Sequence, residues 1–309
     1  MQKVLIIGSL SDDPGETEAL GRLQDTCVNG LQAVDTQASV SFCHLDEIGY
    51  IVNETKAVIY DYRNQCLLTD YQLLVFRGKL QARMNDVALL SNFAALNNIK
   101  TLNSAHQARR ATGKVPQMYQ LRQLGLPFPA TVAGHARYMA QLIDDNLQYP
   151  VVLKDQHGSH GNNNYLIADR TELEAALSAS PAIDFMAQEM IPNDCDYRVL
   201  IAGDHERIIR RAGIAGSHLN NTSQGAKATL VNASAFSGDI LSQARTFASF
   251  CMYELAGVDV IIHKKTGRHY FLEINSQPQV ASGAFVAEKT IVVGEMLRDI
   301  LGSHAGSVR

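Results

Sequence analysis

The sequence lacks several features that mark specialised classes of protein. Its 309 residues contain no tryptophan, and none of the five cysteines stands in a CxxC pair, which argues against a disulfide framework and a thiolate zinc site. No apolar run approaches the roughly 18 residues of a membrane-spanning helix, and no signal-peptide pattern opens the chain. Since 27 Lys and Arg stand against 31 Asp and Glu, no general attraction to polyanions is expected. We therefore expect a cytoplasmic protein with reduced thiols that binds neither nucleic acid nor membranes.

The chain also lacks the glycine turn of dinucleotide-binding folds. An apolar run over residues 3–8 and a helical pattern over 15–34 predict a strand–loop–helix unit. The loop between them, GSLSDDPG, does not have the G-x-G-x-x-G spacing, so we do not expect NAD or FAD. A helix is predicted over 86–97. The further predicted strands, which together favour a largely parallel sheet, are 40–44, 57–61, 73–77 and 100–102.

The central third predicts a helix and a hairpin. The helical pattern over 105–124 is stopped by GLPFP, because proline removes a donor and disfavours helix in the residue before it. A strand over 150–154, a glycine-bearing loop and a returning strand over 165–168 predict a hairpin. Thr171 and Glu174 have the spacing of a capping box, which predicts the start of another helix.

The last third predicts a second set of strands and two helices. One helix is expected over 239–256, ended by Gly257, and the other over 284–301. The expected strands are 185–191, 196–202 and 205–212. Because the chain exceeds the size of one core, about 100 to 200 residues, we predict several folding units. The predicted units are an N-terminal α/β domain over 1–108 and subdomains over 109–191 and 192–309.

The most informative segment is residues 257–275, GVDVIIHKKTGRHYFLEIN, where two apolar runs flank a polar turn and predict a β-hairpin. For a register symmetric about Thr266, the expected pairs are Asp259 with Glu273, Ile261 with Phe271 and His263 with His269. Strand alternation then places Asp259, Glu273 and Asn275 on one face. The opposite, apolar face is expected to hold Val258, Val260, Ile262, Leu272 and Ile274. Two carboxylates and an amide oxygen are hard ligands that suit Mg²⁺.

An alternative interpretation is that Asp259 and Glu273 form surface ion pairs with cations of the hairpin turn. The candidate partners are Lys264, Lys265 and Arg268. Charged hairpins are common, and such exposed pairs contribute little to stability. The position of Glu273 and Asn275 within an apolar strand weakens this interpretation, because burial of a polar group without a partner is costly.

A second candidate feature is Lys154, which ends an apolar strand and precedes a loop with two glycines, Gly158 and Gly161. Glycines allow a main chain whose N–H groups face phosphate oxygens, and a lysine at the base of the loop neutralises charge. The loop is not a Walker A motif, because no G-K-[ST] opens a helix. The alternative is a simple glycine turn beside a lysine.

The order of these motifs resembles the ATP-grasp ligases, most closely the branch of ribosomal-protein glutamate ligases and glutathione synthetases. The motifs are LK with a glycine loop, QEMIP, CDYRVLIAGD, IIRRA, an N-x-x-x-G loop, AGVDVI and LEINSQP. They extend from residue 108 to the final helix. The resemblance implies a fold of mixed α/β and α+β class, in which an N-terminal parallel-sheet domain precedes two ATP-grasp subdomains that bind ATP between them.

The resemblance also implies roles for individual residues. Lys114 and Lys154 would contact ATP phosphates. The loop that folds over them would include Gly158, Ser159 and Gly161, and the adenine would be lined by Gln188, Glu189, Met190 and Ile191. The metal ligands, for Mg²⁺ or alternatively Mn²⁺, would be Asp259, Glu273 and Asn275. Arg198 and Arg211 would face the γ-phosphate and the acyl phosphate, while Asn221 and Gly225 would belong to a loop beside the substrate.

Some of these residues have simpler interpretations. Lys114 has the alternative of a solvated helical lysine, and Arg198 and Arg211 that of ion pairs on a strand face. Arg77 ends the apolar strand LLVFRG, where an open α/β sheet binds ligands, so it is a candidate for binding a substrate carboxylate. Its alternative is a surface arginine. The sequence SQPQ after Asn275 departs from the small residue, proline and glycine of many relatives, and the phosphate loop is rich in His and Asn.

The function implied is an ATP-dependent carboxylate–amine ligase. A substrate carboxylate would attack the γ-phosphate to give an acyl phosphate, and an amine would then displace phosphate to form an amide. The expected substrates are an amino acid and an amino acid, peptide or protein terminus. The alternatives are a non-catalytic ATP-binding protein and a kinase of a small carboxylate. From family habit, a homodimer or homotetramer is expected.

Overall fold

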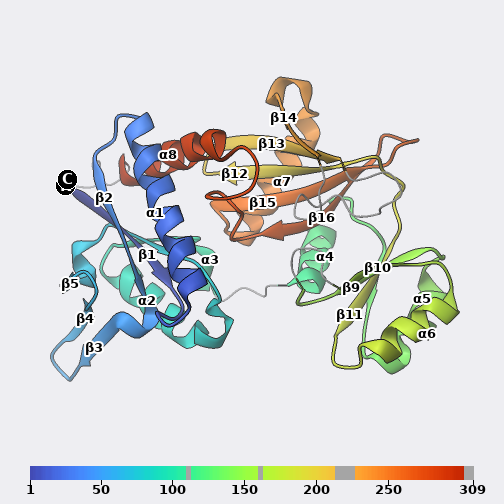
Figure 1. Cartoon of the computed structure of the whole chain (residues 1–309), viewed down its shortest axis with the longest axis horizontal. Helices are drawn as coiled ribbons and strands as arrows, with labels where there is room; N and C mark the ends of the chain where they lie inside the picture. The colour runs from blue at the N-terminus through green and yellow to red at the C-terminus, as the bar shows by residue number, and fades with distance from the viewer. Residues whose placement is uncertain (109–112, 159–162, 213–226, 303–309) are drawn as a thin grey trace.

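The computed structural model describes residues 1–108, 113–158, 163–212 and 227–302 (Figure 1). Three sheet-based units and a small added sheet make up these residues. Within the same residues, no helix combines the length and apolarity needed to cross a membrane.

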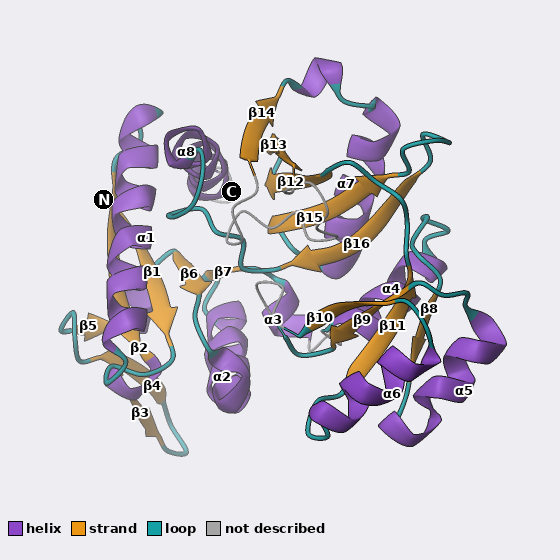
Figure 2. Cartoon of the chain, turned by 45° about the vertical axis from the view of Figure 1, so that its right-hand side comes forward, coloured by secondary structure: helices purple, strands orange, loops and turns teal. Residues whose placement is uncertain are grey.

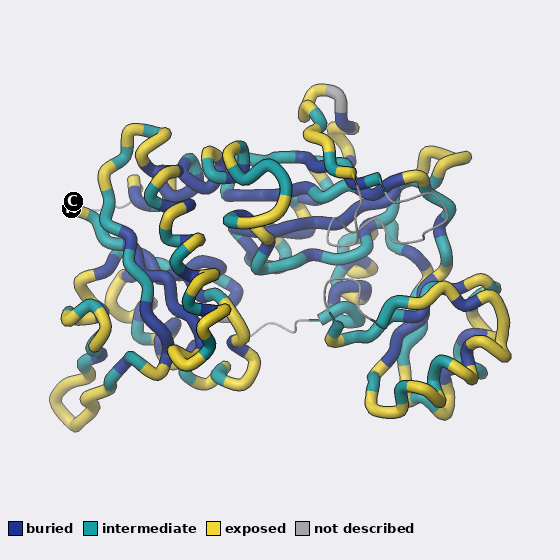
Figure 3. Tube along the Cα trace, viewed as in Figure 1, coloured by how far each residue is buried: buried dark blue, intermediate teal, exposed yellow. Residues whose placement is uncertain are grey.

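The N-terminal unit is built on a parallel sheet with strand order β2-β1-β6-β7. Its strands are β1 (Gln2–Gly8), β2 (Ala38–His44), β6 (Leu73–Phe76) and β7 (Lys100–Leu102). Helix α1 (Pro14–Ala33) packs on one face of the sheet and α2 (Met84–Leu96) on the other, so β1 is buried on both faces (Figure 3). The prediction of a parallel sheet is confirmed for these strands.

A three-stranded antiparallel sheet is inserted between β2 and β6. It consists of β3 (Ile48–Val52), β4 (Ala57–Asp61) and β5 (Cys66–Leu67). The assignment of residues 57–61 to the parallel sheet is therefore wrong. The connections around β4 are too short for the crossover that a parallel neighbour needs, so its strands pair as hairpins. Short 3₁₀ turns lie at Leu45–Glu47, Leu68–Asp70, Leu80–Arg83 and Ala233–Ala235.

The middle unit is an antiparallel sheet with strand order β10-β9-β11-β8. Its strands are β8 (Thr131–Ala133), β9 (Val151–Asp155), β10 (Asn164–Ile167) and β11 (Phe185–Glu189). Helices α5 (Ala136–Asn146) and α6 (Arg170–Ala179) pack on this sheet and form its core. The predicted hairpin is confirmed as β9 and β10. The predicted cap of α6 is wrong, because Asp169 rather than Thr171 accepts the bond from a first-turn N–H, that of Glu172, at 3.0 Å.

The C-terminal unit is a five-stranded antiparallel sheet with strand order β14-β13-β12-β15-β16. Its strands are β12 (Asp196–Ala202), β13 (His205–Ala212), β14 (Lys227–Val231), β15 (Leu255–Ile262) and β16 (His269–Asn275). Helix α7 (Gly238–Cys251) packs on one face, together with α4 (Lys114–Gln123). Part of the other face meets α8 (Val286–Gly302) and the N-terminal unit (Figure 2).

Two helix predictions need correction. The pattern over 105–124 is two helices, α3 (Ala105–Ala108) and α4, and Gly113 enters α4 with a positive φ of 109°. Helix α7 ends at Cys251, because Met252 adopts the left-handed conformation that turns the chain into β15. Gly257 therefore does not end the helix and instead lies inside β15.

The N-terminal and C-terminal units share one apolar core. The buried residues of β1 and α1 pack with Leu200, Ala202 and the inner face of α8. Gly30 of α1 and Gly294 of α8 meet at the helix crossing, where a Cβ on Gly294 would lie 2.1 Å from the Gly30 carbonyl oxygen. Absence of side chains at this crossing lets the two backbones touch.

We expect Gly30→Ala to destabilise the protein by about 1 to 3 kcal/mol, because its Cβ would lie 2.5 Å from the Thr290 carbonyl oxygen of α8. The matched control is Gly21→Ala on the same helix, where a Cβ would meet nothing within 4 Å. Because alanine loses less backbone conformational entropy on folding than glycine, the control should stabilise the protein by about 0.5 to 1 kcal/mol. Urea unfolding measures both changes. Equal effects of the two substitutions would contradict the close packing of α1 on α8.

Candidate functional site

Strands β15 and β16 bring the predicted metal ligands together. Asp259 pairs with Glu273, as predicted, and Gly257 pairs with Asn275. A β-bulge after Asp259 then shifts the register. The observed pairs beyond it are Val260 with Phe271, Ile261 with Tyr270 and Ile262 with His269, so the predicted partners of Ile261 and His263 are wrong.

The bulge also changes which side chains back the site. Where two residues face one, the strict alternation of a strand is interrupted. Phe271 is therefore fully buried in the core beneath α7, together with Val258, Val260 and Ile274. Leu272, which was predicted to belong to that apolar face, is only half-buried.

Asp259 lies at the centre of a buried array of alternating charges. Arg198, its direct partner across β12 and β15, donates from Nε at 2.7 Å and from Nη2 at 2.6 Å to its two oxygens. Arg211 Nη2 lies 3.1 Å from Asp259 Oδ2 and also binds Asp196, with Nε and Nη2 at 2.6 and 2.9 Å from its oxygens. Asp259 is 5 % exposed, so the alternative of surface ion pairs with the hairpin turn is wrong for this residue.

The electrostatics of the array differ between its two carboxylates. Burial alone would raise the pKa of Asp259, but the guanidinium groups of Arg198 and Arg211 outweigh it and hold that pKa well below its usual range. Burial raises the pKa of Asp196, and the nearby Asp259 carboxylate adds to the rise. The structure thus brings Arg198 and Arg211 together as ion-pair partners on a strand face that also holds the predicted metal ligands.

Glu273 and Asn275 form the more open part of the predicted metal site. Asn275 Nδ2 donates to Glu273 Oε1 at 2.8 Å, and the nearest guanidinium nitrogen of Arg198 lies 4.0 Å from that oxygen. The Glu273 side chain is 29 % exposed. Among the described residues no three His, Cys, Asp or Glu converge on one point, and Asn275 offers an amide oxygen beside Glu273. This donor set of two carboxylates and an amide fits a hard cation such as Mg²⁺.

Two lysines from the facing elements approach this surface. Lys154 of β9 donates to Gln188 Oε1 at 2.7 Å. Burial lowers its pKa, and Lys114 lowers it further, whereas the carboxylates of Glu273 and Asp259 act in the opposite direction. Lys114 begins α4, and its Nζ donates to the Gly158 carbonyl at 2.5 Å, so it is not the freely solvated lysine of the alternative interpretation.

The residues predicted to line the adenine lie at the end of β11. Gln188 is 2 % exposed, and its Nε2 donates to Thr131 Oγ1 at 3.0 Å. Glu189 is exposed, Met190 is half-buried and Ile191 is buried. Their contact with adenine stays a prediction. Four other predicted site residues, Ser159, Gly161, Asn221 and Gly225, lie outside the described residues.

Arg77 lies just beyond β6, at the edge of the sheet where it was predicted. Its Nη2 donates to the Pro278 carbonyl at 2.9 Å, and its Nη1 is buried with no hydrogen-bond partner. Burial lowers the pKa of Arg77 to about 10. The alternative of a surface arginine is therefore wrong, while its role in binding a substrate carboxylate stays a prediction.

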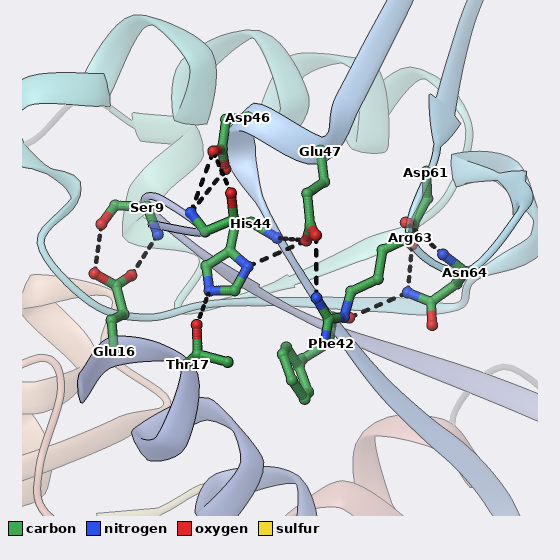
Figure 4. Close-up of polar contacts among 11 residues, drawn as sticks. Ser9, Glu16, Thr17, Phe42, His44, Asp46, Glu47, Asp61, Arg63 and Asn64 are labelled. Atoms are coloured by element: carbon green, nitrogen blue, oxygen red, sulfur yellow. Dashed lines mark hydrogen bonds and ion pairs between the residues drawn. The ribbon is translucent and has the colours of Figure 1, made fainter. Parts of the chain in front are cut away.

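The turn between β1 and α1 is filled by a carboxylate of the chain itself (Figure 4). Glu16 accepts from the Ser9 N–H at 2.5 Å and from the Ser9 hydroxyl at 2.6 Å. Beside it, buried His44 contacts Thr17 Oγ1 at 3.2 Å and Glu47 Oε2 at 3.1 Å. Glu16 occupies the position beside a helix N-terminus where dinucleotide-binding folds hold a phosphate.

Two side chains that support the site were not predicted from the sequence. Gln117 of α4 bonds both main-chain groups of Ile274, which lies between Glu273 and Asn275, at 2.9 and 3.0 Å. Nothing in the sequence marks this glutamine, because the contact spans 157 residues. Lys289 of α8 is 4 % exposed. A signal for it exists, since helical spacing places this lysine on one stripe with Val292, Val293 and Met296.

Comparison with known proteins agrees with this geometry. A family model for the RimK-like ATP-grasp domain matches residues 111–299. A probable alpha-L-glutamate ligase of Pasteurella multocida is 27% identical over 230 residues, which are 72% of this chain and 70% of that protein. An N5-carboxyaminoimidazole ribonucleotide synthase of Synechococcus elongatus is 28% identical over 109 residues, 35% of this chain and 28% of that protein.

Solved structures share the fold over nearly the whole chain. A Chryseobacterium gregarium RiPP-associated ATP-grasp ligase, in complex with ADP and a leader and core peptide, has a TM-score of 0.68 at 14% identity and covers 98% of this chain and 97% of its own. The macrocyclase MdnC of Microcystis aeruginosa, bound with precursor peptide MdnA, has a TM-score of 0.67 at 15% identity, with 96% and 100% covered. The predicted fold class and the predicted resemblance to ATP-grasp ligases are confirmed.

We expect Gln117→Leu to lower the free energy of unfolding by about 1 to 3 kcal/mol, because the buried N–H and carbonyl of Ile274 lose their partners. Urea unfolding checks this loss. The exposed Gln123 on the same helix provides the control variant Gln123→Leu, which should change stability by less than about 0.5 kcal/mol. If the two variants unfold alike, the bond from α4 to β16 does not stabilise the protein.

Proposed function

We propose that this chain, which belongs to the RimK-like ATP-grasp family, joins an acidic amino acid to an amine through an acyl phosphate. The observation that carries the proposal is the convergence of Asp259, Glu273 and Asn275 with Arg198 on one face of the C-terminal sheet, opposite Lys114 and Lys154. The acidic substrate is suggested by the glutamate ligase relative. A peptide as the amine substrate is suggested by the precursor-peptide complexes of the structural neighbours.

The charges of the site suit an anionic nucleotide. The cations that interact across it are Arg198, Arg211, Lys114, Lys154 and Lys289, and the carboxylates that interact with them are Asp155, Asp196, Asp259, Glu273 and Glu288. Lys114 and Lys154 bind the neutral oxygens of Gly158 and Gln188, so their charges favour phosphate groups and the charge that develops on them during transfer.

The reaction has two steps. An oxygen of the substrate carboxylate bonds to the γ-phosphorus as the bond from that phosphorus to ADP breaks. The amine nitrogen then bonds to the acyl carbon, phosphate leaves, and the amine loses a proton. Mg²⁺, or alternatively Mn²⁺, would be held by Glu273, Asn275 and Asp259 and would neutralise phosphate charge when bound. Lys154 and Lys114 would orient the phosphates, and Arg198 would stabilise the charge on the transferring group.

We expect Glu273→Gln to lower kcat for amide formation by at least about 100-fold, because a carboxylate that faces the metal and phosphates is removed. Its free energy of unfolding should change by less than about 1 kcal/mol, since Glu273 is partly exposed. The control is Glu174→Gln, at an exposed position of α6. Near-normal amide formation by Glu273→Gln would contradict the metal assignment.

The substrates would be found by measuring phosphate release from Mg-ATP with a pooled library of amino acids and dipeptides. Mass spectrometry of each responding mixture should reveal a product lighter by one water than its two reactants. ADP and phosphate without a condensed product would instead favour a kinase of a small carboxylate. Binding of Mg-ATP without any substrate-dependent turnover would favour a macromolecular amine substrate or the non-catalytic alternative.

A further inference from the structure

The loop that follows Asn275 is hydrogen-bonded to residues beyond the ends of β6 and β7 and to helix α8. Asn103, beyond β7, donates to the Ser276 carbonyl at 2.9 Å. Gln277 accepts from the Gly78 N–H at 2.9 Å and donates to the Gly78 carbonyl at 3.3 Å. Pro278 accepts from Arg77, as described above. We name residues 276–282 the acceptor loop. All these donors and acceptors outside it lie at strand ends of the N-terminal sheet.

The other end of the acceptor loop is held by Lys289 of α8. Its Nζ donates to the carbonyls of Gln279 at 2.8 Å and Ser282 at 2.6 Å. Lys289 is thus a buried cation and Arg77 a half-buried one whose Nη1 is inaccessible, and both bind main-chain carbonyls instead of carboxylates. Burial of a cation against a neutral carbonyl is unfavourable compared with a carboxylate partner. Holding the loop in this way therefore costs free energy, which indicates that the position of the loop is important for the function of the neighbouring site.

The acceptor loop also packs directly against the site. A Cβ on Gly257 would lie 3.2 Å from Pro278 Cβ and 3.5 Å from Arg198 Cδ. Pro278 therefore lies against the stretch of β15 that pairs with Asn275 and that leads, two residues later, to Asp259. Asn275 directly precedes the loop in the sequence, and Arg198 lies beside the contact between Gly257 and Pro278. A displacement of the loop would therefore move both side chains.

We propose that Arg77 is a positioning residue of the ligase reaction, which together with Gln277 and Lys289 fixes the acceptor loop and thereby the geometry of Asn275 and Arg198. Through Arg77 and Gln277 the N-terminal domain sets the geometry of the metal site, from which it is otherwise remote in sequence. The SQPQ sequence, which departs from the pattern of many relatives, supplies the glutamine that binds Gly78. The inference rests on the proposed function for its kinetic consequence and for the metal site.

The test uses the full chain with three substitutions: Arg77→Met, Arg77→Lys and Gln277→Ala. The control is Lys79→Met, which removes an exposed cation beside the same strand end. Hydrogen exchange of the peptide covering residues 270–285 should be at least about fivefold faster in Arg77→Met and Gln277→Ala, and unchanged in the control. Gln277→Ala keeps the test usable if loss of the Arg77 guanidinium prevents folding.

A second readout measures the metal site directly. Electron paramagnetic resonance with Mn²⁺ and ADP should show at least about fivefold weaker Mn²⁺ binding in Arg77→Met, with Arg77→Lys between it and the unchanged chain. With substrates in hand, kcat should fall at least about tenfold while the KM for the carboxylate changes less than about twofold. A purely structural role would lower stability without this pattern.

Three outcomes would overturn the inference. Unchanged exchange in residues 270–285 would show that the acceptor loop is not held by these side chains. Faster exchange with unchanged Mn²⁺ binding and kcat would show that the loop does not position the site. A large rise in the carboxylate KM, with kcat and Mn²⁺ binding unchanged, would make Arg77 a substrate ligand. If the unchanged chain binds no Mn²⁺ and ADP, the proposed function fails, and hydrogen exchange still decides whether the loop is held.

Discussion

The buried array of Asp196, Arg211, Asp259 and Arg198 is the constraint on which the site depends. Its members come from three neighbouring strands, β12, β13 and β15, and all but Arg198 are nearly inaccessible to solvent. Removal of one partner from a buried ion pair costs about 3 to 5 kcal/mol, because the remaining charge has no compensation. The array therefore stabilises the pairing of the three strands around Asp259, and the pairing of β15 with β16 places Glu273 and Asn275 beside it.

The same strands connect the site to the rest of the molecule. On one face of β12, Val199 and Ile201 pack beneath α7. On the opposite face, Arg198 belongs to the site, whereas Leu200 and Ala202 enter the core shared with α1 and α8. Since alternate residues of a strand share a face, the charged site and the interdomain core are neighbours on one surface. The N-terminal domain is thus packed against the strand that carries Arg198.

Most helices and strands, and the pairing of Asp259 with Glu273, could be predicted from the sequence because they depend on patterns among neighbouring residues. Runs of apolar residues with period two predicted β15 and β16, and a turn of the right length placed Asp259 opposite Glu273. The bulge that buries Phe271 in place of Leu272 was not predictable, because it depends on packing beneath α7. The ion pairs that Arg198 and Arg211 form with Asp259 could not be predicted from the sequence either. Arg198 is 61 residues away, and only the sheet order β12-β15 brings the two together.

Gly257 was correctly singled out in the sequence, but its structural role differs from the predicted one. The glycine follows a helical pattern and was therefore interpreted as its end, but Met252 ends α7 in the left-handed conformation instead. In the structure Gly257 lies within β15, where a Cβ would lie 3.2 Å from Pro278 Cβ and 3.5 Å from Arg198 Cδ. A glycine inside a strand often marks such a close approach. A side chain at Gly257 would crowd the acceptor loop, which the N-terminal domain holds against the strand that carries Asp259.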